Sequence, residues 1–134
     1  MRGILSDHNI EGHFRALIAL WEVEPLHECW EDLDIADESF TSLGISPDIS
    51  DAKLWHTCQA QGLVLFTANR NDEGIDSLEA TISRYNQTTS LPVVTLANPI
   101  RFGRDREYAA KVAERAIEYL LEINNYLGTG RIYV

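Results

Sequence analysis

Carboxylate and amide side chains collect directly after two segments that the sequence predicts as buried strands. Asp7 and Asn9 follow the apolar segment near the N-terminus, and a second polar group follows the longest apolar run. The second group consists of Thr67, Asn69, Arg70 and Asp72. A third acid, Asp51, begins a predicted helix between the two segments. Carboxylates that share a cleft repel one another unless a cation intervenes, and oxygen ligands of this kind favour Mg²⁺ or Mn²⁺ over zinc.

These residues define a candidate site for metal-assisted cleavage of a phosphodiester. A divalent ion held by Asp7, Asp51 and Asp72 would activate water, and Asn69 would complete or orient the site. Local roles are the alternative. Asp7 could cap the helix that follows it, which stabilises a helix by about 1 kcal/mol. Asp51 could simply interact with its own helix dipole, and residues 67–76 could be an Asn/Asp/Gly turn without a ligand.

The elements that must position these residues alternate between short apolar strands and amphipathic helices. The pattern predicts strands at 2–6, 35–40, 63–67, 91–96 and 131–134, and helices at 10–21, 26–33, 51–61, 77–85 and 105–124. Ser50 and Asp76 are the predicted N-caps of the third and fourth helices, and Gly62 ends the third.

Such alternation is typical of the α/β class. It predicts a three-layer α/β/α sandwich with a mostly parallel central sheet, formed by a single domain over residues 1–134. In open parallel sheets, the loops beyond the carboxyl ends of the strands carry the ligand site. Asp7 and the loop after residue 66 are therefore expected at the same edge, whereas the position of Asp51 depends on a topology that the pattern leaves open.

The composition limits the partners and the compartment. A formal net charge of −10 disfavours nonspecific attraction to nucleic acid and to anionic membranes, although a partner protein could supply the missing positive charge. No apolar run approaches the length of a membrane span, and the N-terminal residues do not have the pattern of a signal peptide, so we expect a cytoplasmic protein. Cys29 and Cys58 are isolated, which predicts two buried thiols and neither a disulfide framework nor a zinc site.

Several catalytic classes lack their defining motifs in this chain. The four histidines offer no HExxH or Cys/His metal spacing, and no glycine-rich phosphate loop is present. Acyl transfer of the malonyltransferase type requires a nucleophilic serine on a Gly-x-Ser-x-Gly elbow, and the chain contains no such pentapeptide. The sequence does not support a malonyltransferase.

Three segments in order resemble a known family. They are Ile4-Leu5-Ser6-Asp7-His8-Asn9, then Leu43-Gly44-Ile45 leading to Ser50-Asp51, then Gly62-Leu63-Val64-Leu65-Phe66-Thr67-Ala68-Asn69 with Asp72 shortly after. This arrangement resembles the PIN-like superfamily, in particular its compact branch of unknown function related to toxin ribonucleases. The resemblance implies a three-layer α/β/α sandwich, Mg²⁺- or Mn²⁺-dependent cleavage of RNA, and a homodimer.

The resemblance also implies roles for individual residues. Asp7 would be the metal ligand after the first strand, Asp51 the acid at a helix start, and Asp72 the remaining acid. Asn69 stands where the family usually has the Asp of a Thr-x-Asp motif. Thr67 and Arg70 would position the scissile phosphate or neighbouring ligands, and Asn9 is the third implied positioning residue.

Two departures from the family pattern support an alternative function. Asn69 is neutral where an acid is expected, and Asn9 stands where many relatives have Glu. An amide oxygen can ligate Mg²⁺, but the loss of negative charge should lower the affinity for the metal. The alternative is therefore a catalytically impaired PIN-like domain that binds a partner protein or a nucleotide-like ligand through the same cleft.

Overall fold

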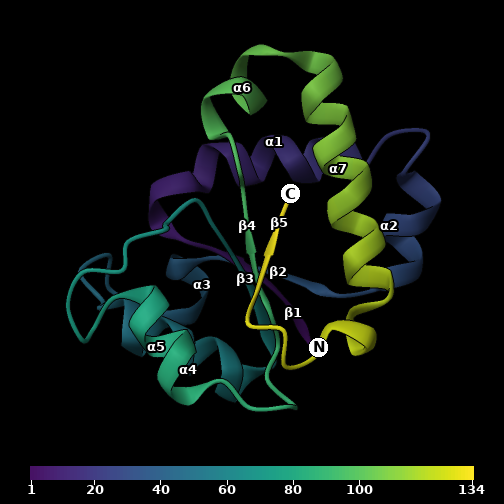
Figure 1. Ribbon diagram of the computed structural model, residues 1–134. Coiled ribbons are helices and arrows are strands. Elements are labelled where there is room, and N and C mark those ends of the chain that lie inside the picture. Colours follow the sequence, from purple (N-terminus) through teal and green to yellow (C-terminus); the bar gives the residue numbers. More distant parts are fainter.

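Five parallel strands form a central sheet in the order β2-β1-β3-β4-β5 (Figure 1). A computed structural model of the chain describes residues 1–134. The strands are β1 (Gly3–Ser6), β2 (Ala36–Glu38), β3 (Leu63–Thr67), β4 (Val93–Thr95) and β5 (Arg131–Tyr133). The strand order reverses between β1 and β3, because the chain leaves β1 for the edge strand β2 and then returns to the other side of β1. A crevice for a ligand is expected at such a reversal.

Helices cover both faces of the sheet, and Figure 1 shows the two groups on opposite sides. One group comprises α1 (Glu11–Trp21), α2 (His27–Leu33), α6 (Pro99–Arg104) and α7 (Arg106–Leu121). The other comprises α3 (Phe40–Leu43), α4 (Asp51–Gln61) and α5 (Leu78–Tyr85). Two short 3₁₀ helices, His8–Ile10 and Ile123–Tyr126, precede α1 and follow α7. The predicted three-layer α/β/α sandwich is confirmed, and every strand pairing is parallel.

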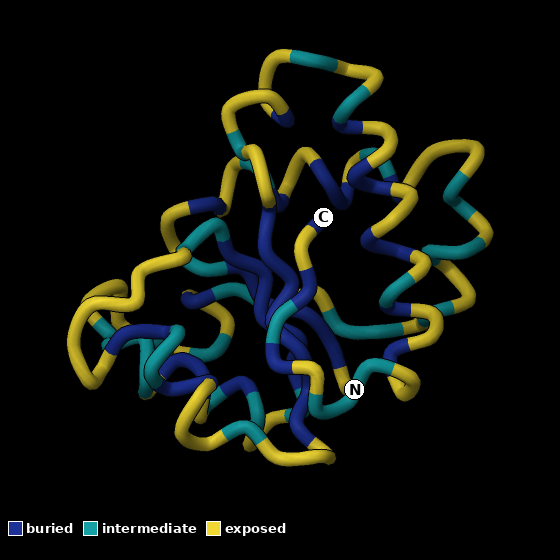
Figure 2. Tube along the Cα trace, viewed as in Figure 1, coloured by how far each residue is buried: buried dark blue, intermediate teal, exposed yellow.

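Each inner strand sends alternate side chains into two apolar clusters. In β1, Ile4 packs into the larger cluster and Leu5 into the smaller one. Phe66 and Leu65 divide in the same way in β3, as expected where successive side chains point to opposite faces. The inner strands β1, β3 and β4 therefore form the buried band through the middle of the molecule in Figure 2. This burial explains why these segments are continuously apolar and do not alternate with polar residues.

The register of β1 against β3 determines which residues meet at the carboxyl edge. Ser6 pairs with Phe66, and the Asp7 amide donates to the Phe66 carbonyl at 2.7 Å. The ladder therefore continues one residue beyond β1. This places Asp7 beside Thr67, the last residue of β3, at the reversal of the strand order.

The structure differs from the predicted elements at several ends. The N-cap of α5 is Ser77, whose hydroxyl accepts from the Ala80 amide at 3.2 Å, so the prediction of Asp76 as the cap is wrong by one residue. The sequence favoured Asp76 because Glu79 stands three residues later, yet Glu79 turns to an arginine of β5 instead. The strand predicted at 91–96 is limited to 93–95, and that predicted at 35–40 to 36–38.

A helix that the sequence pattern did not predict, α6, follows β4. The run Ala97-Asn98-Pro99 indicated only a break, but the Asn98 side chain accepts from the Arg101 amide at 3.0 Å and Pro99 occupies the first turn. The next helix, α7, is capped by Asp105, which accepts from the Tyr108 amide at 3.1 Å. That hydrogen bond lowers the pKa of the Asp105 carboxyl. Among all these helices, none combines the length and the apolar character that a membrane crossing requires.

Candidate functional site

Asp7 lies at the carboxyl end of β1 and does not act as a helix cap. It precedes the 3₁₀ helix and α1, but its side chain makes no capping hydrogen bond to either. Instead, its Oδ2 accepts from the Thr67 hydroxyl at 3.0 Å, while its Oδ1 has no hydrogen-bond partner within the protein. The local role considered for Asp7 is thus absent, and one carboxylate oxygen remains available.

The hydroxyl of Thr67 joins the ends of two neighbouring strands. Thr67 is fully buried, and its Oγ1 donates to Asp7 and accepts from the Asn69 amide at 2.9 Å. Threonine suits this position because it is β-branched and because one hydroxyl can donate and accept at once. The hydroxyl therefore fixes the Asp7 carboxylate and the start of the following loop relative to each other.

The Asn69 side chain connects the β3 loop to the start of α4. Its Nδ2 donates to Asp51 Oδ2 at 2.9 Å, and its Oδ1 accepts from the Asn71 amide at 2.8 Å. Asp51 lies in the first turn of α4, which Ser50 caps by accepting from the Lys53 amide at 3.2 Å. The topology thus brings Asp51 to the carboxyl edge, and both polar atoms of the Asn69 side chain are engaged there.

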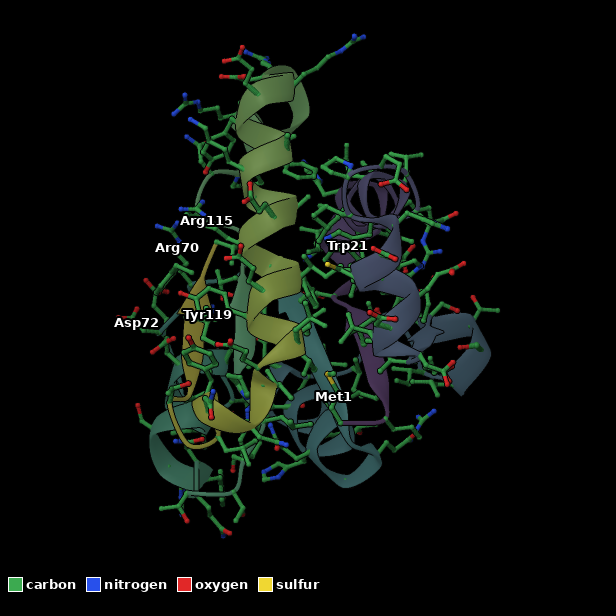
Figure 3. The ribbon with its side chains drawn as sticks, turned by 90° about the vertical axis from the view of Figure 1, so that its right-hand side faces the viewer. Met1, Trp21, Arg70, Asp72, Arg115 and Tyr119 are labelled. Atoms are coloured by element: carbon green, nitrogen blue, oxygen red, sulfur yellow. The ribbon has the colours of Figure 1, made fainter.

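The loop after Asn69 is built from two consecutive turns closed by asparagine side chains. After the bond from the Asn71 amide to Asn69, the Asn71 Oδ1 accepts from the Glu73 amide at 3.0 Å. Asparagine favours such turns because its side-chain oxygen can accept a hydrogen bond from the backbone N–H two residues further along the chain. The backbone of this loop therefore forms turns, as the Asn/Asp/Gly composition predicted. Asp72 is exposed in the loop and projects from the outer side of the molecule in Figure 3.

Arg131 of β5 supports this loop through a hydrogen bond to its backbone, a role that the sequence pattern did not reveal. Its side chain is 7% exposed, and its Nη1 donates to the Asn69 carbonyl at 2.8 Å and to Thr95 Oγ1 at 2.7 Å. Its Nε donates to Glu79 of α5. The available signal was a charged residue at the start of an otherwise apolar terminal strand, since such a residue, when buried, must find partners.

Arg70, predicted to position a phosphate, turns toward the C-terminal strand. Its guanidinium donates to the Ala97 carbonyl and lies 5.2 Å from the centroid of the Tyr133 ring. In Figure 3 its side chain extends from the outer side of the molecule, near Asp72. Stacking on an aromatic ring and the hydrogen bond together keep this cation on the β5 side of the loop.

A cavity of about 520 Å³ opens at the carboxyl edge beside these residues. Its polar lining is Asp7, Asn9, His13, Asn69 and Asn71, and its apolar lining is Ile10, Ala68, Pro99 and Ile100. The volume lies in the usual range of small-molecule sites. Three of the predicted site residues thus share one cavity, whereas Asp51, Thr67, Arg70 and Asp72 do not line it.

His13 is the second residue that the sequence interpretation missed. The spacing of the histidines predicts no metal site, but the His13 Nε2 lies 3.1 Å from the Pro99 carbonyl and its ring lies 5.9 Å from that of Phe102. Because a carbonyl only accepts, Nε2 carries the proton and donates. The bond ties α1 to the first turn of α6, which forms one wall of the cavity. The role of His13 could not be predicted from the sequence, because its partner Pro99 lies in α6, a helix that the pattern did not predict.

The carboxylates at this edge do not form a preassembled metal centre. No group of three or more His, Cys, Asp or Glu side chains is placed to hold a metal ion. Asp7 and Asp51 each accept a hydrogen bond from a neutral donor of the β3 end, and the Asn69 oxygen faces a backbone amide. Each of these two acids keeps one carboxylate oxygen without a hydrogen bond, and the metal role of Asp7, Asp51 and Asp72 stays a prediction.

A buried thiol lies close to this edge. Burial in α4 and, as the smaller cause, the negative charge of Asp7 together raise the pKa of Cys58 to about 12. Because only the thiolate is a strong nucleophile or metal ligand, Cys58 stays a neutral apolar side chain at physiological pH. Cys29 is only partly buried, so the prediction of two buried thiols is confirmed for Cys58 alone.

Comparisons of the chain with protein-family models, with curated proteins and with solved structures find no match. The PIN-like resemblance therefore rests on the sequence motifs quoted above.

Proposed function

We propose that the chain is a PIN-like domain that binds a small ligand or a partner protein at the carboxyl edge of its sheet and does not cleave phosphodiesters. The observation that carries the proposal is the hydrogen bond from Asn69 Nδ2 to Asp51 Oδ2, at 2.9 Å. An aspartate at position 69 could not donate this bond. The departure from the family pattern is thus used by the fold.

The hydrogen bond from Asn69 stabilises the Asp51 carboxylate without a cation. Two acids at one edge are tolerated because Asp51 accepts from an amide and Asp7 accepts from a hydroxyl. Hydrogen bonds to charged groups contribute about 1.5–3 kcal/mol each, so an ion that took Asp7 Oδ2 and Asp51 Oδ2 would have to displace contacts of this size. The Asn69 oxygen would also have to leave the Asn71 amide before it could ligate an ion.

The nuclease interpretation makes a different use of the same residues. In it, Asp7, Asp51 and Asp72 hold Mg²⁺ or Mn²⁺ and the substrate is RNA. It requires the exposed Asp72 to move toward the other two acids, and it must overcome the repulsion between phosphate and a chain of net charge −10. The binding interpretation requires neither a movement of Asp72 nor the binding of a phosphate.

Thermal unfolding with millimolar Mn²⁺ separates the two functions. A ligand that binds only the folded state adds about 2.7 kcal/mol of stability at a hundred times its dissociation constant. We expect no Mn²⁺-dependent rise of the melting temperature for the wild-type chain and no cleavage of RNA. In Asn69→Asp, three acids face one another without the amide donor, so we expect a lower melting temperature that Mn²⁺ raises.

The matched control is Asn124→Asp, which adds the same charge at an exposed position in the 3₁₀ helix after α7. Its melting temperature should not respond to Mn²⁺. Metal-dependent cleavage of RNA by the wild-type chain, abolished in both Asp7→Ala and Asp51→Ala, would overturn the binding function and establish the nuclease.

A further inference from the structure

The cavity at the carboxyl edge is lined by a negative charge and by no Lys or Arg side chain. Asp7 is its one carboxylate. The nearest arginine in sequence, Arg70, is held on Tyr133 and on the Ala97 carbonyl. Arg101 follows Ile100 of the cavity lining in the sequence. Its side chain donates to Asp105 and lies 4.5 Å from the Tyr108 ring centroid. An anionic ligand would therefore meet a carboxylate without a compensating cation.

The cavity lining offers both acceptors and donors that make no hydrogen bond within the protein, the donors being the side-chain NH2 groups of Asn9 and Asn71. Asp7 Oδ1 has no partner in the protein, because Thr67 occupies only Oδ2. Proton donation from His13 Nε2 to the Pro99 carbonyl leaves Nδ1 as an acceptor in the neutral ring. Asn9 is exposed, and its side chain makes no hydrogen bond within the protein. A ligand with several N–H groups therefore finds two acceptors here, Asp7 Oδ1 and His13 Nδ1.

The rest of the wall is apolar. Ile10 is buried, whereas Ile100 of α6 is 68% exposed. Pro99 and Ala68 complete this part of the lining. A ligand with an apolar stem and a polar, positively charged head would place the stem on Ile100 and Pro99 and the head on Asp7. Long cationic side chains have this division.

We infer that the cavity binds an organic cation of the guanidinium or alkylammonium type, with Asp7 Oδ1 as its counter-ion. This inference rests on the proposed function, since it assigns a ligand class to the same site. A net charge of −10 attracts such ligands at long range, whereas it repels phosphates. The cation is either the head of a free small molecule or an arginine or lysine side chain of a partner protein, and the two sources share one recognition chemistry.

Isothermal titration calorimetry with three kinds of probe tests the inference. Agmatine represents a free small molecule, and an acetylated Gly-Arg-Gly amide represents a side chain of a partner. The same peptide with citrulline in place of arginine keeps the shape without the charge. We expect the two cationic probes to bind at least tenfold more tightly than the citrulline peptide and than uridine monophosphate. Tighter binding of agmatine indicates a small-molecule ligand, and tighter binding of the peptide indicates a partner protein.

Variants at two positions locate the binding. Asp7→Asn keeps an oxygen that accepts from Thr67 but removes the charge, and it should weaken the cationic probes at least tenfold. Asp32→Asn removes an exposed carboxylate on α2 and should leave the affinity unchanged. Because Ile100 is exposed, it tolerates a charge without loss of the fold: Ile100→Lys should weaken and Ile100→Glu should strengthen binding.

Three results would overturn the inference: no measurable binding of either cationic probe, equal affinity in Asp7→Asn, or preferential binding of uridine monophosphate. None of them by itself decides the proposed function, which fails instead on Mn²⁺-dependent cleavage of RNA. A chain insensitive to Mn²⁺ that also ignores the cationic probes would keep its binding function but lose this ligand class.

Discussion

Replacement of Thr67 by valine tests whether the hydrogen bonds at the carboxyl edge stabilise the fold. Valine has nearly the same shape and stays in the preferred β-branched class, so the change removes the hydroxyl with little change in volume. Thr67 is fully buried, and its hydroxyl serves both Asp7 and the Asn69 amide. Thr67→Val therefore removes two hydrogen bonds and leaves an amide and a carboxylate oxygen without their partner.

The magnitude follows from the two bonds. A hydrogen bond to a charged group contributes about 1.5–3 kcal/mol, and one between neutral groups contributes about 1 kcal/mol. Burial of a methyl group in place of a hydroxyl returns part of this, because the desolvation of the hydroxyl is no longer required. We expect Thr67→Val to lower the free energy of unfolding by ~2–3 kcal/mol.

Thr81→Val is the matched control. Thr81 is also buried, at 1% exposure, but its hydroxyl donates at 2.8 Å to the Ser77 carbonyl, which already accepts the Thr81 amide at 3.0 Å. Loss of that hydroxyl leaves no unpaired group, so the expected cost is below about 1 kcal/mol. Both variants are measured by urea unfolding, with the midpoint changing at constant slope.

A double variant separates the two bonds. In Asp7→Asn the charge is absent, so addition of Thr67→Val should cost less than it does in the wild-type chain, with a coupling of about 1 kcal/mol between these contacting residues. If Thr67→Val costs no more than Thr81→Val, the hydroxyl does not hold the site together. The account of Asp7 and Asn69 given above is then wrong.

Three further predictions concern the support of the site and the core. Cys29 should react with a thiol reagent in the folded chain at pH 8, whereas Cys58, with a pKa of about 12, should react only on unfolding; two fast thiols would contradict this. Arg131→Met removes the buried end of the ion pair with Glu79 and leaves the Asn69 carbonyl and the Thr95 hydroxyl without their donor, so it should lower the free energy of unfolding by about 2–4 kcal/mol in urea, and a smaller effect than Thr81→Val would refute the role. In Gly3→Ala the added Cβ would lie 2.4 Å from a carbonyl oxygen of β2, so hydrogen exchange should quicken in β2 before the other strands, and unchanged exchange would exclude this clash.

The alternation of apolar strands and helices was sufficient to predict the layers of the fold. Strands that are buried on both faces must be apolar at every position, and β1 and β3 have this pattern because Ile4 and Leu5 enter different clusters. Clear caps also fixed the third helix, which begins after Ser50 and ends at Gly62. These features are local in sequence, so the pattern contains them.

Contacts between distant segments could not be predicted in the same way. The α6 helix depends on Asn98 as its cap and on the bond between His13 and the Pro99 carbonyl, 86 residues away in sequence. Arg131 reaches the Asn69 carbonyl across 62 residues. No periodicity encodes such pairs. The edge location of Asp51 likewise required the strand order, which places α4 beside β3.

The neutrality of Asn69 has a consequence for the kind of charge that the site can bind. An acid at this position would place a third carboxylate at an edge where Asp7 and Asp51 already lie, and only a divalent cation could balance the three. With asparagine, Asp51 Oδ2 accepts from the amide and Asp7 Oδ2 accepts from the Thr67 hydroxyl. Of the two acids only Asp7 lines the cavity, so its Oδ1 remains for a ligand there, beside an apolar wall. A single positive charge on an organic stem balances that oxygen, so the same substitution that disfavours a metal ion favours a monovalent organic cation.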